Sequence, residues 1–371
     1  MSSRRGHNEG TIYQRPNGKF QAQISLPDGS RKTFTAATKR EVQALVRQAQ
    51  LDMTAGRVVI SNRQTMREFL DSWLAAVEPS VRYSTFRCYE LNADRASRYI
   101  GRIRLDALQP VHLQKTYAAL SAEGLSPRSV ELAHAVLRAA LRYGIRLGVI
   151  RYNPADAVIP PRPVRGEVKT LSAEEAQLLF DHAPSPTLRA LFVVLTTTGM
   201  RIGEALGLKW SDINFEHATV SIQRAVQRQR GRGLVYIEPK TALSRRTVQL
   251  TSFAQSELRQ HRARHALSPL NTDVVFASET GTLLDPTNVT HRFQQTRERA
   301  GLPPLRLHDL RHTAATLMLQ EGVHPSIVRE MLGHSTVMLT LGTYSHVMPN
   351  MQRDAATKLD RLFIRDERSL E

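Results

Sequence analysis

The stretch PLRLHDLRHTAATLMLQEGV, residues 304–323, joins the pattern of a buried helix to a charged beginning. Four apolar residues recur at helical spacing and predict a core-facing stripe: Leu310, Ala314, Leu317 and Met318. His308 and Arg311 are three residues apart, so they project from one side of the first turn. A helix N-terminus attracts anions, and a guanidinium and an imidazole add to that attraction. The stretch therefore predicts either a seat for a phosphate or carboxylate, or a solvated first turn with a capping histidine.

Length and composition predict an ordinary globular protein. The chain has 371 residues, enough for two or three domains, with 41% hydrophobic and 23% charged residues. Its one cysteine, Cys88, excludes an internal disulfide, and we expect a cytoplasmic protein. MSSRRGHNEG, at the N-terminus, has no apolar run and predicts no signal peptide. The longest apolar stretch, LRALFVVLTTTGM, is too short and too rich in threonine to cross a bilayer, so no membrane partner is expected.

The charge balance favours a polyanionic partner. Lys and Arg number 51 against 34 Asp and Glu, a formal net charge of +17. Nucleic acid is the usual partner of such a chain, although a basic proteome or a membrane surface produces the same excess. Residues 1–64 carry net +7, residues 65–165 net +6 and the longer remainder only +4. This distribution, with only 6% aromatic residues, favours duplex DNA gripped by the first half over a base-stacking single-strand platform.

The first block of the chain predicts a small sheet and a helix. TIYQR, KFQAQISL and RKTFTA alternate apolar and polar residues and are separated by the turn signals PNG and PDGS. Thr38 and Glu41 form a capping box that opens a helix ending near Gly56. A helix covers only one face of a three-stranded sheet. The other face is either an unliganded accessory surface or, as the basic charge favours, a surface for a DNA groove.

The second block predicts a bundle of four helices. Thr65 and Glu68 form a capping box before MREFLDSWLAAV, and Ser84 is the expected cap of TFRCYELNADRASRYI. Pro110 opens VHLQKTYAAL, and Ser126 with the proline after it opens RSVELAHAVLRAALRYGIRL. Arginines on the polar faces are ordinarily just solvated, and here the net charge favours contact with a DNA backbone.

A proline-rich stretch, NPADAVIPPRPVRGEVKT, then breaks all periodicity and predicts a domain boundary. The third block opens with a capping box of Ser172 and Glu175 and continues through helices, a β segment and more helices. Within it LFVVLTTTGMRIGEALGLKW predicts a buried helix broken at Gly199. After the break comes Arg201, for which Glu204 is a possible ion-pair partner.

Three further polar residues of this block stand out. EPKTALSRRTVQL places Lys240 at the turn of an expected hairpin, where a lysine is normally just solvated. LGHSTVMLTLGTYSHV carries His334 in a glycine-containing turn and Tyr344 ten residues later. Each residue alone is weak evidence for a site.

Together these segments resemble the tyrosine recombinases, specifically the phage-type integrases. TTTGMRIGEALGLKW, PKTALSRRTVQL, HDLRHTAATLM and LGHSTVMLTLGTYSHV follow in the family's order, and YNPA ends the central helical block. The resemblance covers essentially the whole chain. It implies an arm-type DNA-binding domain at 1–64, a helical core-binding domain at 65–157, a linker at 158–168 and a catalytic domain with a C-terminal tail helix at 169–371. One departure is Gly342, where many relatives carry a more polar residue.

The fold expected is multidomain and mainly α with small β-sheets: a three-stranded sheet plus helix, a helical bundle, and a mixed α+β catalytic domain. Carried over by position, the resemblance implies six catalytic residues: Arg201, Lys240, His308, Arg311, His334 and the nucleophile Tyr344. It also implies cleavage and rejoining of duplex DNA through a covalent 3′-phosphotyrosyl intermediate, integrating or excising an element such as a prophage.

The chemistry agrees with the residue types. A tyrosine oxygen can be both nucleophile and leaving group, so a covalent intermediate preserves the phosphodiester bond energy. Two guanidiniums suit the non-bridging oxygens of a pentavalent phosphorane. Lys240 can protonate the leaving 5′ oxygen, His308 can act as a general base or hydrogen-bond donor, and His334 can hold a phosphate oxygen. His312 lies about 100° further round the helix from Arg311 and is expected either to support the site residues from behind or to be structural.

Metal-dependent chemistry is the less favoured alternative. Five histidines are close in the sequence: His308, His312, His324, His334 and His346. The chain has no H-E-x-x-H motif, no cysteine pair and no acidic cluster for Mg²⁺, and Asp309 alone cannot make a two-metal nuclease. No cofactor is therefore expected.

Three rival functions and several partners remain to be weighed. A type IB topoisomerase uses similar chemistry, but the amino-terminal sheet, LGHS and the domain order argue against it. A chromosome-dimer resolvase generally lacks the first block, and a non-catalytic DNA-binding regulator needs none of the six residues. The resemblance implies core-type and arm-type attachment sites in duplex DNA, a homotetramer on DNA, and a host DNA-bending protein and an excisionase as possible partners. Met351, Ala355, Leu359 and Leu362 predict a tail helix that packs on its own domain or, as in relatives, on a neighbouring protomer.

Overall fold

The structure is a computed structural model that describes residues 11–25, 31–54, 64–163, 169–239, 245–267 and 272–333, with positions 356 and 360. By its internal contacts the chain divides between residues 165 and 166 into two compact units, and each is described by itself. The described part is mainly helical with small antiparallel sheets, as the sequence predicts.

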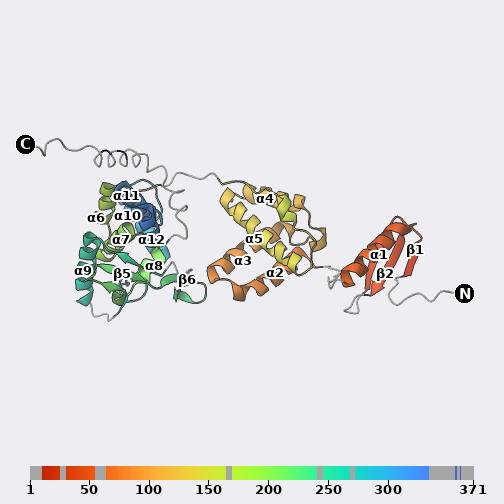
Figure 1. The fold of residues 1–371 in the computed structure, drawn as a ribbon, viewed down its shortest axis with the longest axis horizontal. Coiled ribbons are helices and arrows are strands. Elements are labelled where there is room, and N and C mark those ends of the chain that lie inside the picture. Colours follow the sequence, from red (N-terminus) through yellow and green to blue (C-terminus); the bar gives the residue numbers. More distant parts are fainter. Residues whose placement is uncertain are drawn as a thin grey trace, which may run out of the picture. The chain divides into compact units, whose positions relative to one another are not determined.

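The chain begins with the predicted three-stranded sheet. Strands β1 (Thr11–Gln14), β2 (Phe20–Ser25) and β3 (Arg31–Ala36) are antiparallel in the order β1-β2-β3. Helix α1 (Lys39–Thr54) packs on one face of the sheet (Figure 1) over a small apolar core: Ala22, Ile24, Val42, Val46 and Ala49. The predicted capping box is confirmed, since the Thr38 amide donates to Glu41 at 3.2 Å. The predicted helix end at Gly56 lies outside the described residues.

The four predicted helices of the second block are confirmed as α2 (Met66–Val77), α3 (Tyr83–Ile100), α4 (Pro110–Ala122) and α5 (Pro127–Arg146). They share one core, which includes Phe69 and Trp73. Short 3₁₀ turns join or follow them: η1 (Glu78–Ser80), η2 (Leu105–Ala107) and η3 (Pro154–Ala157). The caps predicted at Thr65 and Ser126 are confirmed.

The cap predicted at Ser84 is wrong. Arg82, in an extended conformation and without a capping side chain, is the N-cap of α3. The helix therefore begins at Tyr83, and Ser84 lies inside its first turn.

The second unit mixes helices with two small sheets. Its helices are α6 (Ala173–Asp181), α7 (Pro186–Thr198), α8 (Ile202–Leu206), α9 (Ser252–Ala266), α10 (Pro286–Arg299), α11 (Asp309–Gln320) and α12 (Pro325–Leu332), with the 3₁₀ turn η4 (Trp210–Asp212). Its strands are β4 (Ile213–Asn214), β5 (Thr219–Ile222), β6 (Ala225–Gln229), β7 (Gly233–Ile237) and β8 (Arg246–Gln249). The capping box predicted at Ser172 is confirmed at the start of α6.

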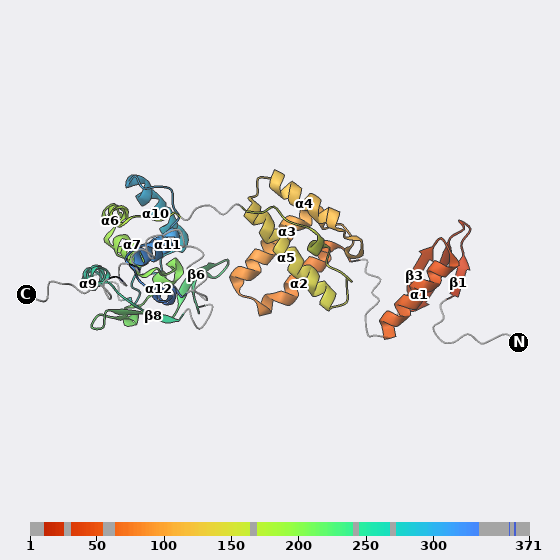
Figure 2. The same ribbon diagram turned by 45° about the horizontal axis from the view of Figure 1, so that its top comes forward.

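Helix α7 is the centre of this unit. Most of its residues are buried, and it packs against α6, α9 and α11 (Figure 2). Helix α11 is the one predicted from residues 304–323. Leu310 and Ala314 of its predicted stripe are buried, whereas Leu317 and Met318 are only partly buried. Because α7 and α11 pack together, the residues just after α7 lie beside the first turn of α11.

The hairpin expected around Lys240 is wrong. Strand β7 pairs with β6, and β8 pairs with β5 in the separate sheet β4-β5-β8. The segment holding Lys240 therefore connects two sheets, because alternation predicts strands but not their partners. Lys240 itself and the tail positions Met351, Ala355, Leu359 and Leu362 lie outside the described residues.

Candidate active site

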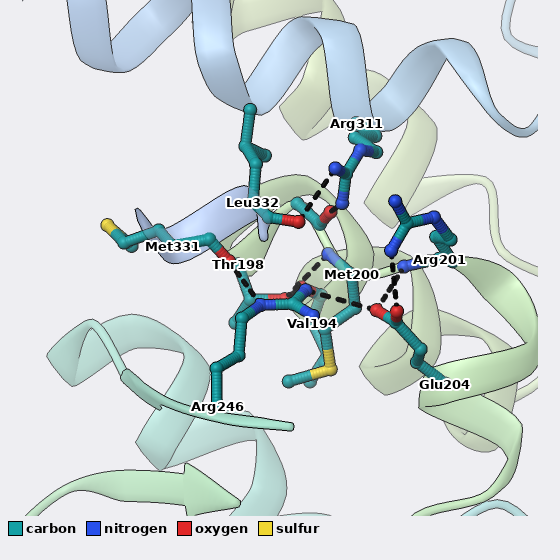
Figure 3. Close-up of polar contacts among 10 residues, drawn as sticks. Val194, Thr198, Met200, Arg201, Glu204, Arg246, Arg311, Met331 and Leu332 are labelled. Atoms are coloured by element: carbon teal, nitrogen blue, oxygen red, sulfur yellow. Dashed lines mark hydrogen bonds and ion pairs between the residues drawn. The ribbon is translucent and has the colours of Figure 1, made fainter. Parts of the chain in front are cut away.

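Arg311 is a buried arginine in the first turn of α11, only 4% exposed. Its guanidinium donates to two backbone carbonyl oxygens at 2.7 Å, Nη1 to Gly199 and Nη2 to Leu332 (Figure 3). Gly199 caps the end of α7, and Leu332 is the last residue of α12. Carbonyls at helix C-termini lack intrahelical partners and carry partial negative charge. Arg311 therefore satisfies the ends of two helices at once and is rigidly held.

Gly199 occupies a position that no other residue fits well. Its φ of +64° is left-handed, and a Cβ there would lie 2.3 Å from Cδ2 of Leu332. A side chain would therefore strain the left-handed backbone and displace the Leu332 side chain, beside the two carbonyls that Arg311 binds. The break predicted at this glycine is confirmed.

Arg201 begins the next short helix as the N-cap of α8. Its Nη1 donates to Oε1 of Glu204 at 2.8 Å, and its backbone amide donates to Oε2 of the same carboxylate at 3.0 Å. The Arg201 side chain is 43% exposed, while that of Glu204 is 6% exposed. The ion pair expected from the i, i+3 spacing is therefore present, and the arginine keeps a solvent-accessible surface.

A third arginine completes this cluster. Nη2 of Arg246, at the start of β8, lies 3.0 Å from Oε2 of Glu204, and its Nε donates to the carbonyl of Met331 at 2.6 Å (Figure 3). Burial alone raises the pKa of Glu204. The positive charges of Arg246 and Arg201 and the hydrogen bonds from both outweigh burial and hold that pKa below its ordinary value. Glu204 is thus a buried carboxylate between two guanidiniums.

His308 precedes α11 and lies among positive charges. Its ring centroid is 5.8 Å from that of His312. Although part of the His308 side chain is open to solvent, packing of protein atoms around it lowers its pKa. The charges of Arg311, His312 and Arg201 lower the same pKa further. The lowered pKa favours the neutral imidazole, which is able to accept a proton.

The start of α11 is anchored by two further contacts. Asp309 accepts from the Arg306 amide at 2.7 Å and from Nη2 of Arg306 at 2.8 Å. Thr313 Oγ1 accepts from the amide of Leu171 at 3.1 Å, tying the residues just before α6 to α11. These bonds fix the backbone that carries His308 and Arg311.

The structure thus places three of the six predicted site residues together. Arg201, His308 and Arg311 come from the starts of α8 and α11, and their charges are close enough to act on one another. Lys240, His334 and Tyr344 lie outside the described residues; His334 directly follows Gly333, the left-handed cap of α12. The two guanidiniums of this group suit an anion with several oxygens, such as a phosphodiester.

Arg246 is the residue that sequence reasoning missed. In RTVQL, Arg246 and the buried Val248 share one face of β8, so an arginine occupies an inward position of an alternating strand. An inward arginine predicts a buried partner of opposite charge. That signal does not identify the partner, because Glu204 lies 42 residues earlier in the chain.

Two general properties concern metals and membranes. Among the residues that the structure describes, no group of three or more His, Cys, Asp or Glu side chains is arranged to hold a metal ion. None of the helices within the described ranges has the length and apolar character needed to span a membrane.

Comparisons with known proteins agree with this geometry. Residues 169–351 match the model of the phage integrase family, and residues 65–121 match the phage integrase N-terminal SAM-like domain. A tyrosine recombinase XerC-like protein of Caldanaerobacter subterraneus subsp. tengcongensis is 31% identical over 94% of this chain and 98% of its own length. The ICEBs1 integrase of Bacillus subtilis is 24% identical over 95% of this chain and 100% of its own length.

Solved structures share the fold. The Tn1549 transposon integrase in complex with transposon right-end DNA matches with a TM-score of 0.70 and 20% identity, over 80% of this chain and 99% of that one. A lambda integrase tetramer bound to a Holliday junction matches with a TM-score of 0.60 and 20% identity, over 88% of this chain and 95% of that one. The resemblance read from the sequence is confirmed: the chain belongs to the phage integrase family of tyrosine recombinases and is a site-specific DNA recombinase.

Proposed function

We propose that this recombinase cuts and rejoins duplex DNA through a covalent 3′-phosphotyrosyl bond to Tyr344, and so integrates or excises a mobile element such as a prophage. The observation that carries the proposal is the meeting of α7, α8 and α11. Arg311 binds the carbonyl of Gly199, two residues before Arg201, so two guanidiniums from separate helices lie at one place.

In the proposed cleavage step, the tyrosine oxygen bonds to phosphorus as the bond to the 5′ oxygen breaks. The 5′ oxygen leaves with the bonding electron pair and takes a proton from Lys240. Rejoining reverses the step: a 5′ hydroxyl attacks the phosphotyrosine, and the tyrosine leaves and regains its proton. The number of phosphodiester bonds is conserved, so no external energy source is required.

Arg201 and Arg311 are proposed to hold the non-bridging oxygens of the transferred phosphate. The charge on these oxygens grows in the pentavalent transition state, and donors fixed beforehand stabilise it without reorganising. The two carbonyl contacts of Arg311 supply that rigidity. His308, whose lowered pKa favours the neutral imidazole, is proposed as general base or hydrogen-bond donor to Tyr344, and His334 as a further donor to the phosphate.

The remaining parts are proposed to bind and assemble. Residues 1–64 would bind arm-type sites, 65–157 core-type sites, 158–168 would be the linker, and 169–371 would hold the chemistry. The net charges of +7 on 1–64 and +6 on 65–165 support DNA contact by the first two. The lambda integrase tetramer bound to a Holliday junction, which shares this fold, supports a tetramer of this chain on DNA.

Action on a bacterial chromosome would place the protein in the cytoplasm, at the nucleoid. A host DNA-bending protein and an excisionase are proposed as accessory partners.

The test is covalent trapping. The substrate is a nicked duplex with the crossover sequence, which is taken from the junctions of the mobile element that carries the gene. Cleavage beside the nick releases a short DNA product, and because this product diffuses away the DNA cannot be rejoined and the covalent complex accumulates. The complex is expected to form in EDTA, to survive denaturation and to be absent with Tyr344→Phe. Cleavage by Tyr344→Phe would refute the nucleophile. Joining of two duplexes by the wild type, rather than relaxation of a supercoiled circle alone, separates recombination from topoisomerase action.

A further inference from the structure

Arg201 and Arg311 of the candidate site belong to a closed ring of contacts. Arg201 is bound to Glu204, Glu204 to Arg246, and Arg246 to the Met331 carbonyl at the end of α12. The next carbonyl of that helix end, Leu332, binds Arg311, which also binds the carbonyl of Gly199, two residues before Arg201. Arg246 thus joins two parts of the ring that are far apart in the sequence: the start of α8 and the end of α12 (Figure 3).

The position of Arg246 in the chain adds to its significance. It begins β8, six residues after Lys240, and it binds the end of α12, three residues before His334. One guanidinium therefore contacts the helix end that also holds Arg311 and the carboxylate that holds Arg201. Its side chain is 6% exposed, and the contacts described here join it to protein groups.

Charge gives Arg246 a second role. Glu204 is buried. If Arg246 were absent, the negative charge of this carboxylate would be neutralised by Arg201 alone, and the pair would have no net positive charge. With Arg246 also present, the group of two arginines and one glutamate has a net charge of +1. Since Arg246 is buried and Arg201 is 43% exposed, this positive charge is available at Arg201.

We propose that Arg246 is a positioning residue of the recombination reaction: it fixes the start of α8 against the end of α12 and neutralises Glu204, so that the charge of Arg201 remains available to the DNA phosphate. The inference rests on the role proposed above for Arg201. A helix cap alone would explain the bond to Met331 but not the shared carboxylate.

The first experiment compares Arg246→Met with Arg245→Met in the full-length protein. Arg245 is the neighbouring arginine, 59% exposed and paired with the exposed Glu238 at 3.2 Å, so its substitution removes the same charge without touching the ring. Covalent-complex formation on the nicked crossover duplex is measured at saturating protein. Arg246→Met is expected to cleave about 10- to 100-fold more slowly, as displacement of a catalytic group by about 1 Å does. Arg245→Met is expected to stay within about threefold of the wild type, as is DNA affinity in both variants.

A double-mutant cycle with Glu204→Gln separates charge sharing from a merely structural role. Alone, Glu204→Gln removes the negative charge that pairs with Arg201 and is expected to slow cleavage. Combined with Arg246→Met it removes the uncompensated carboxylate, and the double variant is expected to cleave at least as fast as Arg246→Met. Losses that multiply would overturn the proposal, because two independent structural defects behave in that way.

Arg246→Lys keeps the inference testable if the methionine variant does not fold. An ammonium group restores the charge but cannot reproduce the planar fork that reaches both Glu204 and Met331, so an intermediate cleavage rate is expected. A wild-type rate with either Arg246→Met or Arg246→Lys would overturn the proposal. Arg201→Ala is assayed beside them. If it cleaves normally, the proposed role of Arg201 fails; if it is inactive while the Arg246 variants are normal, only the present inference fails.

Discussion

Arg201 and Arg311 carry the same guanidinium group but differ in their exposure to solvent and in their binding partners. Arg201 is 43% exposed and pairs with a carboxylate, whereas Arg311 is buried and binds helix-end carbonyls. An exposed arginine contributes little to stability, but a buried one leaves unsatisfied carbonyls when it is removed. The two residues should therefore be separable by experiment, although both are proposed to contact the phosphate.

Arg201→Ala is expected to slow single-turnover cleavage by about 10²-fold or more, the usual cost of removing a transition-state donor, with little change in thermal unfolding. Arg311→Ala is expected to show the same kinetic loss and also to destabilise the second unit by about 1–3 kcal/mol for each carbonyl left unsatisfied. Trapping assays and melting curves measure the two effects. Arg299→Ala, at an exposed position at the end of α10, is the control. Equal melting curves for Arg201→Ala and Arg311→Ala would contradict the expected difference in stability between the two variants.

The histidines of the second unit predict a loss of stability in acid. Burial is the largest cause that lowers the pKa of His261, His308 and His312, and positive neighbours lower each further. In the unfolded chain these rings titrate near pH 6.5, so below about that pH the unfolded state binds more protons than the folded state. The free energy of unfolding should therefore fall as pH drops through about 6.5, until the folded histidines also titrate.

Fluorescence can isolate this effect. The chain has two tryptophans, Trp73 in the bundle and Trp210 in the second unit, so Trp73→Phe leaves one reporter of the second unit. Urea unfolding at pH 7.5 and 5.5 is expected to show lower stability at the acid value. His308→Gln removes one of the three titrations and should reduce the difference. A difference that His308→Gln leaves unchanged would show that this ring does not contribute.

At the scale of elements, the contact between the ends of α7 and α12 determines where Arg311 lies. Gly199→Ala is expected to cost roughly 1–2 kcal/mol for the left-handed backbone and roughly 1–3 kcal/mol for overpacking against Leu332. It should also slow cleavage by about tenfold or more, because the Gly199 carbonyl moves and Arg311 with it. Gly301→Ala supplies the matched control: its φ is +67° and no atom lies within 4 Å of the added Cβ. It should lose only the backbone part and cleave normally. Normal cleavage by Gly199→Ala would show that the Gly199 carbonyl does not determine the position of the Arg311 guanidinium.

The elements also show what sequence can predict. Helices with strong caps, such as those at Thr65 and Ser172, are predicted because their signals are local. The hairpin expected at Lys240 failed because the partners of β7 and β8 are distant in the sequence. For the same reason the sequence predicts the pairing of Arg201 with Glu204, three residues apart, but not the pairing of Arg246 with Glu204, 42 residues away. Charge pairs between residues close in the sequence can be predicted from the sequence, whereas the partners of charge pairs between distant segments cannot.

On the scale of the whole molecule, apolar cores and charge are distributed differently. Residues 11–54 have a core of their own, separate from that of the bundle, and the second unit has another. The basic excess is concentrated in the first half, while the proposed chemistry is in the second. Binding and cleavage should accordingly respond to different deletions and substitutions.

The sheet of residues 1–64 is expected to bind a DNA site distinct from the crossover site. Helix α1 covers one face, and alternation along β2 and β3 places Gln23 and Thr33 on the other, where Gln23 donates to Thr33 at 3.3 Å. Polar side chains of this type read base edges in a major groove. A chain beginning at Asn62 should still cleave a nicked core-type site but no longer bind the second site or integrate.

The fragment 1–64 tests the same surface directly, since its described part has its own core. Its affinity for arm-site DNA should fall steeply with salt, as binding by a net charge of +7 requires. Gln23→Ala and Thr33→Ala should each reduce the preference for arm-site over random duplex by about 1–3 kcal/mol for a lost base contact. Gln43→Ala, on the exposed side of α1, should leave that preference unchanged. If the fragment binds no DNA even at low salt, the sheet is an accessory surface. If Gln43→Ala is as harmful as Gln23→Ala, the helix rather than the sheet faces the groove.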